Sequence, residues 1–175
     1  MILETERLIL REMDQNDFNS LYAVLADSDI MEHYPYTFDE VRVRNWISRN
    51  MERYQKDGFG LWAVILKETG EMIGDCGITM QNIHGHLLPE IGYHIRKDQQ
   101  RKGYATEAAA ACVRFAFENF GFPEVYSYMK YTNIPSQRTA IKNGMKFVEE
   151  YKDSDHSYTR VFVIKRIEWE NNHET

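Results

Sequence analysis

Residues 89–108, PEIGYHIRKDQQRKGYATEA, constrain the fold of this chain more than any other segment. Ile91, Tyr93 and Ile95 alternate with polar or small residues, a period of two that is typical of a β-strand. After a short polar turn, the run that begins at Tyr104 is rich in alanine and is typical of a helix. We therefore expect a strand at 87–97 that passes through a tight turn directly into a helix at 104–120.

Other hydrophobic patterns extend this arrangement along the whole chain. Further strands are expected at 7–13, 59–67, 71–80 and 124–131, with a final antiparallel pair in 145–167 that turns at 153–157. Further helices are expected at 14–26, 39–56 and 134–143, and loops at 27–38 and 81–86. The order β-α-α-β-β-β-α-β-α-β-β predicts an α/β (α+β) fold with a mostly antiparallel sheet. With no biased run or internal repeat, residues 1–175 are expected to form a single domain.

The charge balance excludes some partners. A formal net charge of −6 argues against nucleic acid, because neutralising phosphates requires a basic face. An acidic surface is instead compatible with cations and amines. No apolar run approaches the roughly 18 residues of a membrane span, and Glu4 and Glu6 stand where a signal peptide would have positive charge. We therefore expect no membrane association and a cytoplasmic location.

Cysteine and histidine spacings predict no metal site. Cys76 and Cys112 have apolar neighbours and no ligand spacing, so we interpret them as buried thiols rather than a disulfide or a nucleophile. His84 and His86 lack a third ligand, and their loop is interpreted as a surface turn.

The turn before the alanine-rich helix has the features of an anion site. The first N–H groups of a helix have no intrahelical partner and lie at the positive end of its dipole. Arg101 and Lys102 add positive charge, and Gly103 lets a ligand approach the backbone closely. The segment lacks both the Walker pattern and the three-glycine dinucleotide pattern. The alternative is an ordinary strand-to-helix turn with solvated cations.

Six segments of the chain resemble one family in the same order. Gln100-Arg101-Lys102-Gly103-Tyr104-Ala105 matches the [QR]-x-x-G-x-[GA] signature of the GNAT superfamily of N-acetyltransferases. The other five segments resemble its RimJ/RimL-like branch: TERLILR, GFGLWAV, GEMIGDCGI, PEIGYHI and NIPSQRTAIKNGMKF, within about residues 5–148. The chain departs from relatives that often have an aromatic residue and Gly before the Lys, since Gln100 and Arg101 stand there.

The resemblance implies acetyl-CoA as cosubstrate and a GNAT-like twisted, mostly antiparallel sheet flanked by helices. It also implies a V-shaped splay between the fourth and fifth expected strands, 87–97 and 124–131. The pyrophosphate of CoA is then expected on the turn, and the pantetheine arm along the preceding strand. The implied contacts are His94, Ile95, Arg96, Arg101, Lys102, Gly103, Tyr104, Ala105 and Thr106.

Acetyl transfer to an amine needs a base for the amine and a proton for the leaving thiolate. Glu90 is the candidate base, and its alternative is an ion pair with a neighbouring cation. His94 alternates onto the same face, where it assists the base or only lies beside the cofactor. Many relatives use a Tyr as the acid, but Ala140 occupies that position here.

The N-x-x-S pattern of the RimJ/RimL-like branch is matched by Asn133 and Ser136. The resemblance implies that Asn133 holds the pantetheine and that Ser136 approaches the CoA sulfur as the catalytic acid. Both residues are also ordinary helix caps, in which case water protonates the thiolate. Lys142 and Arg138 are candidates for the 3′-phosphate, although lone cations on a short helix usually face solvent.

The resemblance and these residues together predict an N-acetyltransferase that moves the acetyl group from acetyl-CoA to a primary amine by direct attack in a ternary complex. Residues 33–38, with Trp46 and Tyr54, are expected to shape the acceptor pocket. The amine belongs to a protein N-terminus or to a small molecule. The alternatives are a non-catalytic acyl-CoA-binding or regulatory domain and, more weakly, a nucleotide-binding module. Family members are often dimers, so a homodimer is also considered.

Overall fold

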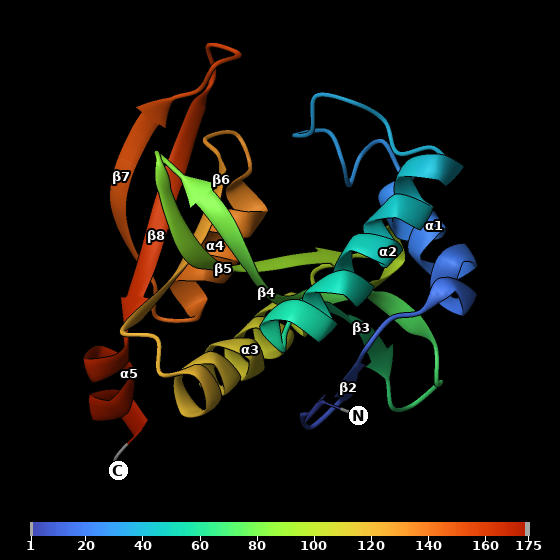
Figure 1. The fold of residues 1–175 in the computed structure, drawn as a ribbon, viewed down its shortest axis with the longest axis horizontal. Helices are drawn as coiled ribbons and strands as arrows, with labels where there is room; N and C mark the ends of the chain where they lie inside the picture. Colours follow the sequence, from blue (N-terminus) through green and yellow to red (C-terminus); the bar gives the residue numbers. More distant parts are fainter. Residues whose placement is uncertain (1, 174–175) are drawn as a thin grey trace.

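The computed structural model describes residues 2–173, so the ends of the expected 1–175 domain lie outside the described residues. It contains a sheet in the order β1-β2-β3-β4-β5-β6-β8-β7 (Figure 1). The strands are β1 (Leu3–Glu4), β2 (Leu8–Arg11), β3 (Leu61–Leu66), β4 (Met72–Ile83), β5 (His86–Ile95), β6 (Glu124–Lys130), β7 (Lys146–Lys152) and β8 (Tyr158–Lys165). The α-helices are α1 (Phe18–Leu25), α2 (Glu40–Asp57), α3 (Tyr104–Phe120), α4 (Ile134–Lys142) and α5 (Arg166–His173). Two 3₁₀ turns, η1 (Gln15–Asp17) and η2 (Lys97–Gln99), precede α1 and α3.

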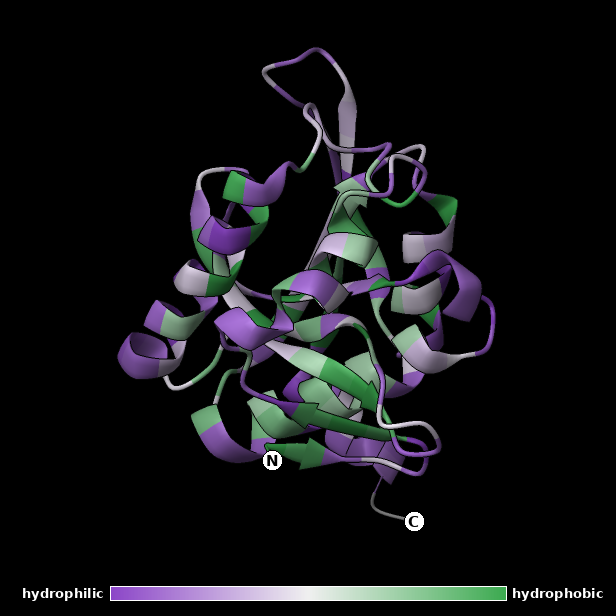
Figure 2. Cartoon of the chain, turned by 90° about the vertical axis from the view of Figure 1, so that its right-hand side faces the viewer, coloured by the Kyte–Doolittle hydropathy of each residue, from purple (hydrophilic) through white to green (hydrophobic). Residues whose placement is uncertain are grey.

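The two faces of the sheet bury separate hydrophobic clusters. Alternate residues of β3 point to opposite faces, so Leu61 and Ala63 pack with α1 and α2, whereas Trp62 and Val64 pack with α3. In Figure 2 the strands are mainly hydrophobic and the exposed loops mainly hydrophilic. Ala108 and Cys112 of α3 are small and fully buried, which lets this helix lie close to the sheet.

The sheet divides between β5 and β6. Every other pair of neighbouring strands is antiparallel, but β5 and β6 are parallel and pair only at Glu90 and Tyr126. Beyond this pair the two strands diverge, and β6, β8 and β7 form a separate wing beside α4 (Figure 1). The mixed, mostly antiparallel fold and its splay are confirmed, with the expected fourth and fifth strands labelled β5 and β6.

Two expected boundaries were wrong. The predicted loop 81–86 is instead the end of β4 and a tight hairpin whose turn residues, His84 and Gly85, both have positive φ. The His84 ring stacks on Tyr151 of β7 at 4.5 Å, which holds this extended hairpin against the neighbouring wing. The expected last strand ends at Lys165, and helix α5 begins at Arg166 with an ion pair of 2.8 Å to Glu170.

Two smaller differences lie near the amino-terminal end of the chain. Asp14 caps a 3₁₀ turn before α1 rather than α1 itself, and a short strand, β1, precedes the expected first strand. Within residues 2–173, no helix combines the length and hydrophobicity that crossing a membrane requires.

Candidate active site

The turn between β5 and α3 presents free backbone donors. Gly103 is the N-cap of α3 with φ +85°, and no side chain caps this end of the helix. The first helical hydrogen bond runs from Glu107 N to Gly103 O, so the N–H groups of Tyr104, Ala105 and Thr106 have no partner within the helix. Gln99, Gln100, Arg101 and residues 103–106 line one large cavity. This arrangement suits a phosphate or pyrophosphate group.

Arg101 and Lys102 behave differently in this turn. Arg101 lines the cavity and has φ +61°, a left-handed conformation that is unfavourable for a residue with a Cβ. Lys102 is not among the cavity residues, and its Nζ donates to Gln99 Oε1 at 3.0 Å. The turn therefore directs only one of its two expected cations into the cavity.

Contacts from the amino-terminal segment, which were not expected from the sequence, fix the turn. Arg7 forms an ion pair of 2.7 Å with Glu107 and donates from Nη1 to Lys102 O at 3.0 Å. Its guanidinium also lies over the Tyr104 ring, 4.5 Å from the centroid. Thr5 Oγ1 donates to Glu107 Oε1 at 2.6 Å. The signal was present, because Thr5 and Arg7 belong to the TERLILR segment and Glu107 follows the signature.

The cavity has a volume of about 1300 Å³ and reaches both faces of the sheet at the splay. On one side it is lined by the turn and by α4, and on the other by α2 and residues 29, 30 and 32–35. Residues from β5 and β6 form its walls between these two sides. One ligand can therefore enter from the α3 face and a second from the α2 face.

The register of β5 with β4 determines which backbone groups of β5 remain for the cavity. Arg96 N donates to Ile73 O of β4 at 2.7 Å. Because alternate residues of an antiparallel strand pair with the same neighbour, the backbone N–H and C=O groups of His94 also point toward β4. The intervening Tyr93 and Ile95 therefore point their backbone groups away from β4. Gln100 Nε2 donates to Ile95 O at 2.9 Å, which gives the first residue of the signature a structural role. The backbone groups of this edge that do not pair with β4 are therefore those of Tyr93 and Ile95, and the contact of a pantetheine arm with residues 94–96 stays a prediction.

The side chains of His94 and Arg96, both expected to contact the cofactor, lie in different places. His94 lines the cavity, whereas Arg96 is not among the cavity residues and pairs with Asp98 at 2.6 Å. Asp98 lies on η2, so this pair stabilises the end of β5 rather than a ligand.

Helix α4 brings its N-terminal residues to Tyr93. Asn133 caps the helix by accepting from Ser136 N at 3.2 Å, which leaves the amide hydrogens of Asn133 available to the cavity. Ser136 Oγ donates to Tyr93 Oη at 3.2 Å, and Tyr93 Oη donates to Ser136 O at 2.9 Å. Burial raises the pKa of Tyr93, so this phenol keeps its proton. Arg138 and Lys142 of the same helix also line the cavity.

Glu90 lies where the two half-sheets meet. Burial raises the pKa of Glu90 to about 7, and the hydrogen bond from Thr79 Oγ1 and the nearby charges of His94 and Arg53 oppose this only in part. A Cβ added to Gly92 would lie 3.0 Å from Glu90 Oε2, so the carboxyl group rests over this glycine. A carboxyl group with this pKa can accept and release a proton near neutral pH.

His94 connects a buried carboxylate to the segment between α1 and α2. Its Nδ1 lies 2.8 Å from Asp75 Oδ1, and its Nε2 lies 2.9 Å from Tyr34 Oη. Asp75 is fully buried and also accepts from Trp46 Nε1 at 2.8 Å. Burial opposes the charged imidazole, but the Asp75 carboxylate outweighs it and raises the pKa of His94. No local pattern in the sequence marks Asp75 or this chain of contacts.

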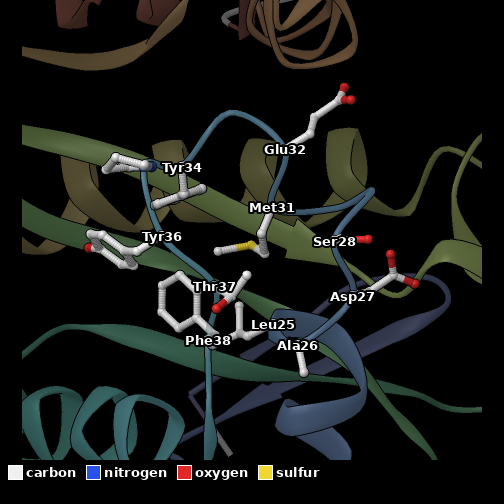
Figure 3. A pocket seen from close by; sticks show the side chains of 11 residues that line it. Leu25, Ala26, Asp27, Ser28, Met31, Glu32, Tyr34, Tyr36, Thr37 and Phe38 are labelled. Atoms are coloured by element: carbon white, nitrogen blue, oxygen red, sulfur yellow. The ribbon is translucent and has the colours of Figure 1, made fainter. Parts of the chain in front are cut away.

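The expected acceptor residues divide into two groups. His33, Tyr34, Pro35 and Trp46 line the large cavity, whereas Tyr54 is buried between Leu61 O and Met13 N and does not line it. Tyr36 and Phe38 line a smaller hollow of about 240 Å³ within residues 25–38 (Figure 3). Met31 and Phe38 lie beside the ring of Tyr36 in this hollow, and Tyr34 lines both the hollow and the large cavity.

No cluster of three or more His, Cys, Asp or Glu residues within residues 2–173 could hold a metal ion. Cys76 and Cys112 are both free and fully buried, with their sulfur atoms 3.7 Å apart.

Comparisons with known proteins agree with this geometry. Residues 7–146 match the family described as "Acetyltransferase (GNAT) domain". Protein YkkB of Bacillus subtilis (strain 168) is 35% identical over 146 residues, which cover 83% of this chain and 85% of that protein. A GNAT-family acetyltransferase structure from Bacillus anthracis is 26% identical with a TM-score of 0.82, covering 94% of this chain and 98% of that one. The RimL ribosomal L7/L12 alpha-N-protein acetyltransferase in complex with coenzyme A shares the fold, with a TM-score of 0.78 and 16% identity over 94% and 97% of the two chains.

The match covers most of the chain, and the chain belongs to the GNAT acetyltransferase family. It is an acetyl-CoA-dependent acetyltransferase.

Proposed function

We propose that this enzyme transfers the acetyl group of acetyl-CoA to the nitrogen of a primary amine, by direct attack in a ternary complex. The observation that carries the proposal is the position of Glu90. Its carboxyl group, with a pKa of about 7, shares one cavity with the free N–H groups at the start of α3. A base near neutrality and an anion site within one cavity suit a base-assisted transfer from a phosphorylated cosubstrate.

The fit of acetyl-CoA rests on three sets of groups in this chain. The N–H groups of residues 104–106, with Arg101, would hold the pyrophosphate. The backbone of Tyr93 and Ile95 and the amide of Asn133 would hold the pantetheine arm. Arg138 and Lys142 line the cavity near α4 and would bind the 3′-phosphate. When bound there, acetyl-CoA supplies an activated acyl group with a thiolate as leaving group.

Glu90 would take a proton from the incoming ammonium group, directly or through one water molecule. A bond then forms between the amine nitrogen and the acyl carbon, the bond between carbon and sulfur breaks, and the products are the acetamide and the free thiol. The Ser136 hydroxyl would turn its hydrogen from Tyr93 Oη to the departing sulfur, while Tyr93 keeps its hydrogen bond to Ser136 O. Because its pKa is raised above that of an ordinary phenol, Tyr93 is a poor proton source for a thiolate of pKa about 8.5. In this mechanism the thiolate receives its proton through water, with Ser136 as an orienting donor.

We propose the RimJ/RimL-like branch for this chain on the five segments that resemble it, with a protein N-terminus or a small molecule as the amine. A single domain acting in the cytoplasm, where acetyl-CoA is available, is part of the proposal. Strand β7 ends the sheet with Phe147 and Val148 exposed, which makes this edge the candidate contact of a homodimer.

Calorimetric titration with acetyl-CoA, CoA and ATP tests the first half of the proposal. We expect micromolar binding of both CoA species and much weaker binding of ATP. A screen of primary amines, followed by thiol release and by mass spectrometry of the acetamide, tests the second half. Binding without turnover of any amine, with Glu90→Gln unchanged in every assay, would favour the non-catalytic acyl-CoA-binding alternative.

A further inference from the structure

Two arginines on α2 face the acceptor side of the cavity. Arg49 and Arg53 are one helical turn apart, and both line the cavity that contains Glu90. Among residues 2–173, neither guanidinium forms an ion pair with a carboxylate. Arg53 is partly buried, and an unpaired cation there is unfavourable unless a ligand supplies the opposite charge, whereas Arg49 is exposed at the rim of the cavity.

A buried amide orients one of these arginines. Asn50 is fully buried, and its Nδ2 donates to Trp46 O at 2.9 Å. Its Oδ1 accepts from Leu61 N at 2.9 Å and from Arg53 Nη1 at 3.1 Å. This contact fixes one edge of the Arg53 guanidinium and leaves its other donors for the cavity. Burial and the neighbouring Arg49 lower the pKa of Arg53, whereas Glu90 opposes this shift.

The other acidic groups of this cavity already have partners. Asp29 pairs with Lys97, Asp155 pairs with Lys130, and Glu32 lies 3.1 Å from His33. Asp153 accepts from Thr159. Glu90, which accepts a hydrogen bond from Thr79 Oγ1, is the carboxyl group that we propose receives the amine, and it lies near the unpaired Arg53. This pattern is complementary to a molecule with one amine and one anion, and it does not suit a polyamine.

CoA does not account for the two arginines. Its phosphates are expected at the start of α3, which packs on one face of the sheet, whereas α2 packs on the opposite face. We propose that the acceptor has a carboxylate near its reacting amine and that Arg49 and Arg53 bind this carboxylate. This inference rests on the proposed N-acetyltransferase function and specifies its substrate class. The carboxylate belongs to a free amino acid or to an acidic side chain close to a peptide amino terminus.

Matched acceptors test the inference. Free amino acids are compared with their carboxamides, and peptides that begin with Asp or Glu are compared with those that begin with Asn or Gln. We expect the acid of at least one pair to exceed its amide by roughly tenfold or more in kcat/KM, because a guanidinium binds a carboxylate through two charge-assisted hydrogen bonds. The two series distinguish the two sources of the carboxylate.

Arg53→Gln and Arg49→Gln should each reduce the preference for the acid to less than about threefold. Arg53→Lys keeps the charge but loses the paired N–H donors of the guanidinium, so its preference should lie between those of the wild type and Arg53→Gln. Lys56→Gln removes the same charge from an exposed position of α2 outside the cavity and should leave the preference intact. Equal losses for acid and amide in the Arg53→Gln variant, or a wild-type preference for amides, would overturn the inference.

A binding measurement separates this inference from the proposed reaction. N-acetyl amino acids and their amides are titrated calorimetrically into the complex with CoA. Tighter binding of the acids, lost in Arg53→Gln, would support the carboxylate site even if no amine were acetylated. Equal binding of acids and amides would overturn the site even if some amines were acetylated.

Discussion

The two halves of the cavity are built in different ways. The half that we propose for acetyl-CoA, the cofactor half, is made mainly of backbone N–H groups from one continuous segment, the turn before α3, and Arg7 and Glu107 brace it at 2.7 Å. The half that we propose for the amine, the acceptor half, is made of side chains from α2, β4, β5 and the 27–38 segment. These side chains meet through long-range contacts such as those of Asp75 with His94 and Trp46.

This difference separates what is shared from what is particular to this chain. A backbone cradle tolerates many side chains, because the donors are present in every residue except proline. An acceptor wall changes with each substitution on it. We therefore expect variants in the first half to alter acetyl-CoA affinity and variants in the second half to alter acceptor use.

The largest effect is expected at Glu90, where the two halves meet. Glu90→Gln should lower kcat by about a hundredfold or more, with acetyl-CoA affinity nearly unchanged, because the variant loses only the base. In the wild type, kcat should rise as the pH passes about 7 and the carboxyl group loses its proton. Steady-state rates from pH 5.5 to 9 and calorimetry of both proteins measure this. A large loss of acetyl-CoA affinity would place Glu90 in the cofactor half instead.

The same substitution should also change stability with pH. The folded state keeps the Glu90 proton up to about pH 7, whereas the unfolded chain loses it near 4.5. The folded state therefore binds more protons between these values, and wild-type stability falls as the pH rises across them. Above pH 7, Glu90→Gln should be more stable by up to about 3 kcal/mol in urea unfolding. If the difference in the free energy of unfolding between wild type and Glu90→Gln were the same at pH 4 and pH 8, the raised pKa of Glu90 would be contradicted.

Glycine substitutions at the two ends of α3 isolate the cofactor half. Gly103 and Gly121 both have positive φ, so a valine at either position should cost about 1–2 kcal/mol of stability. Gly103→Val should also lower acetyl-CoA affinity by more than about tenfold, because it shifts the free N–H groups. Gly121→Val, which has open space around it, should bind normally in calorimetry. Equal affinities in the two variants would show that the turn is not the cofactor site.

A tyrosine pair tests the acceptor half. Tyr34→Phe removes the hydrogen bond to His94, which should raise the acceptor KM about fivefold while acetyl-CoA affinity stays the same. Tyr36→Phe is the matched control, since its ring lines the smaller hollow instead. Steady-state kinetics with a fixed acceptor measure both, and equal KM values in the two variants would argue against a role for the Tyr34 contact.

The smallest effect is expected at Arg101. Arg101→Gly removes a left-handed residue with a side chain and should stabilise the protein by at most about 1 kcal/mol, as measured by thermal unfolding. Loss of the charge should weaken acetyl-CoA binding slightly at low salt and less at high salt. A strong destabilisation would show that the arginine side chain stabilises the turn.

The sequence predicted the cofactor half better than the acceptor half for a physical reason. The alternation in 91–95, the alanine run and Gly103 are local signals, and each determines the backbone within a few residues. The roles of Asp75 and Arg7 depend on contacts with residues far away in the chain, which no local pattern contains. The sequence predicts a loop at the His84-Gly85 hairpin because these two turn residues interrupt the hydrophobic pattern of the strands that continue on either side. The choice between the backbone edges of His94 and Ile95 needed the register with β4.

The single pair that joins β5 and β6 has a mechanical consequence. Glu90 and Tyr126 form the only ladder contact between these strands in the described part of the chain. If one half-sheet tilts against the other to admit or release a ligand, the rotation pivots at this contact. Points far from the pivot, such as the starts of α3 and α4, then move most, while Glu90 moves least. The Glu90 carboxyl group thus lies beside the axis of this rotation, so its position relative to both half-sheets depends least on how far the cleft has opened.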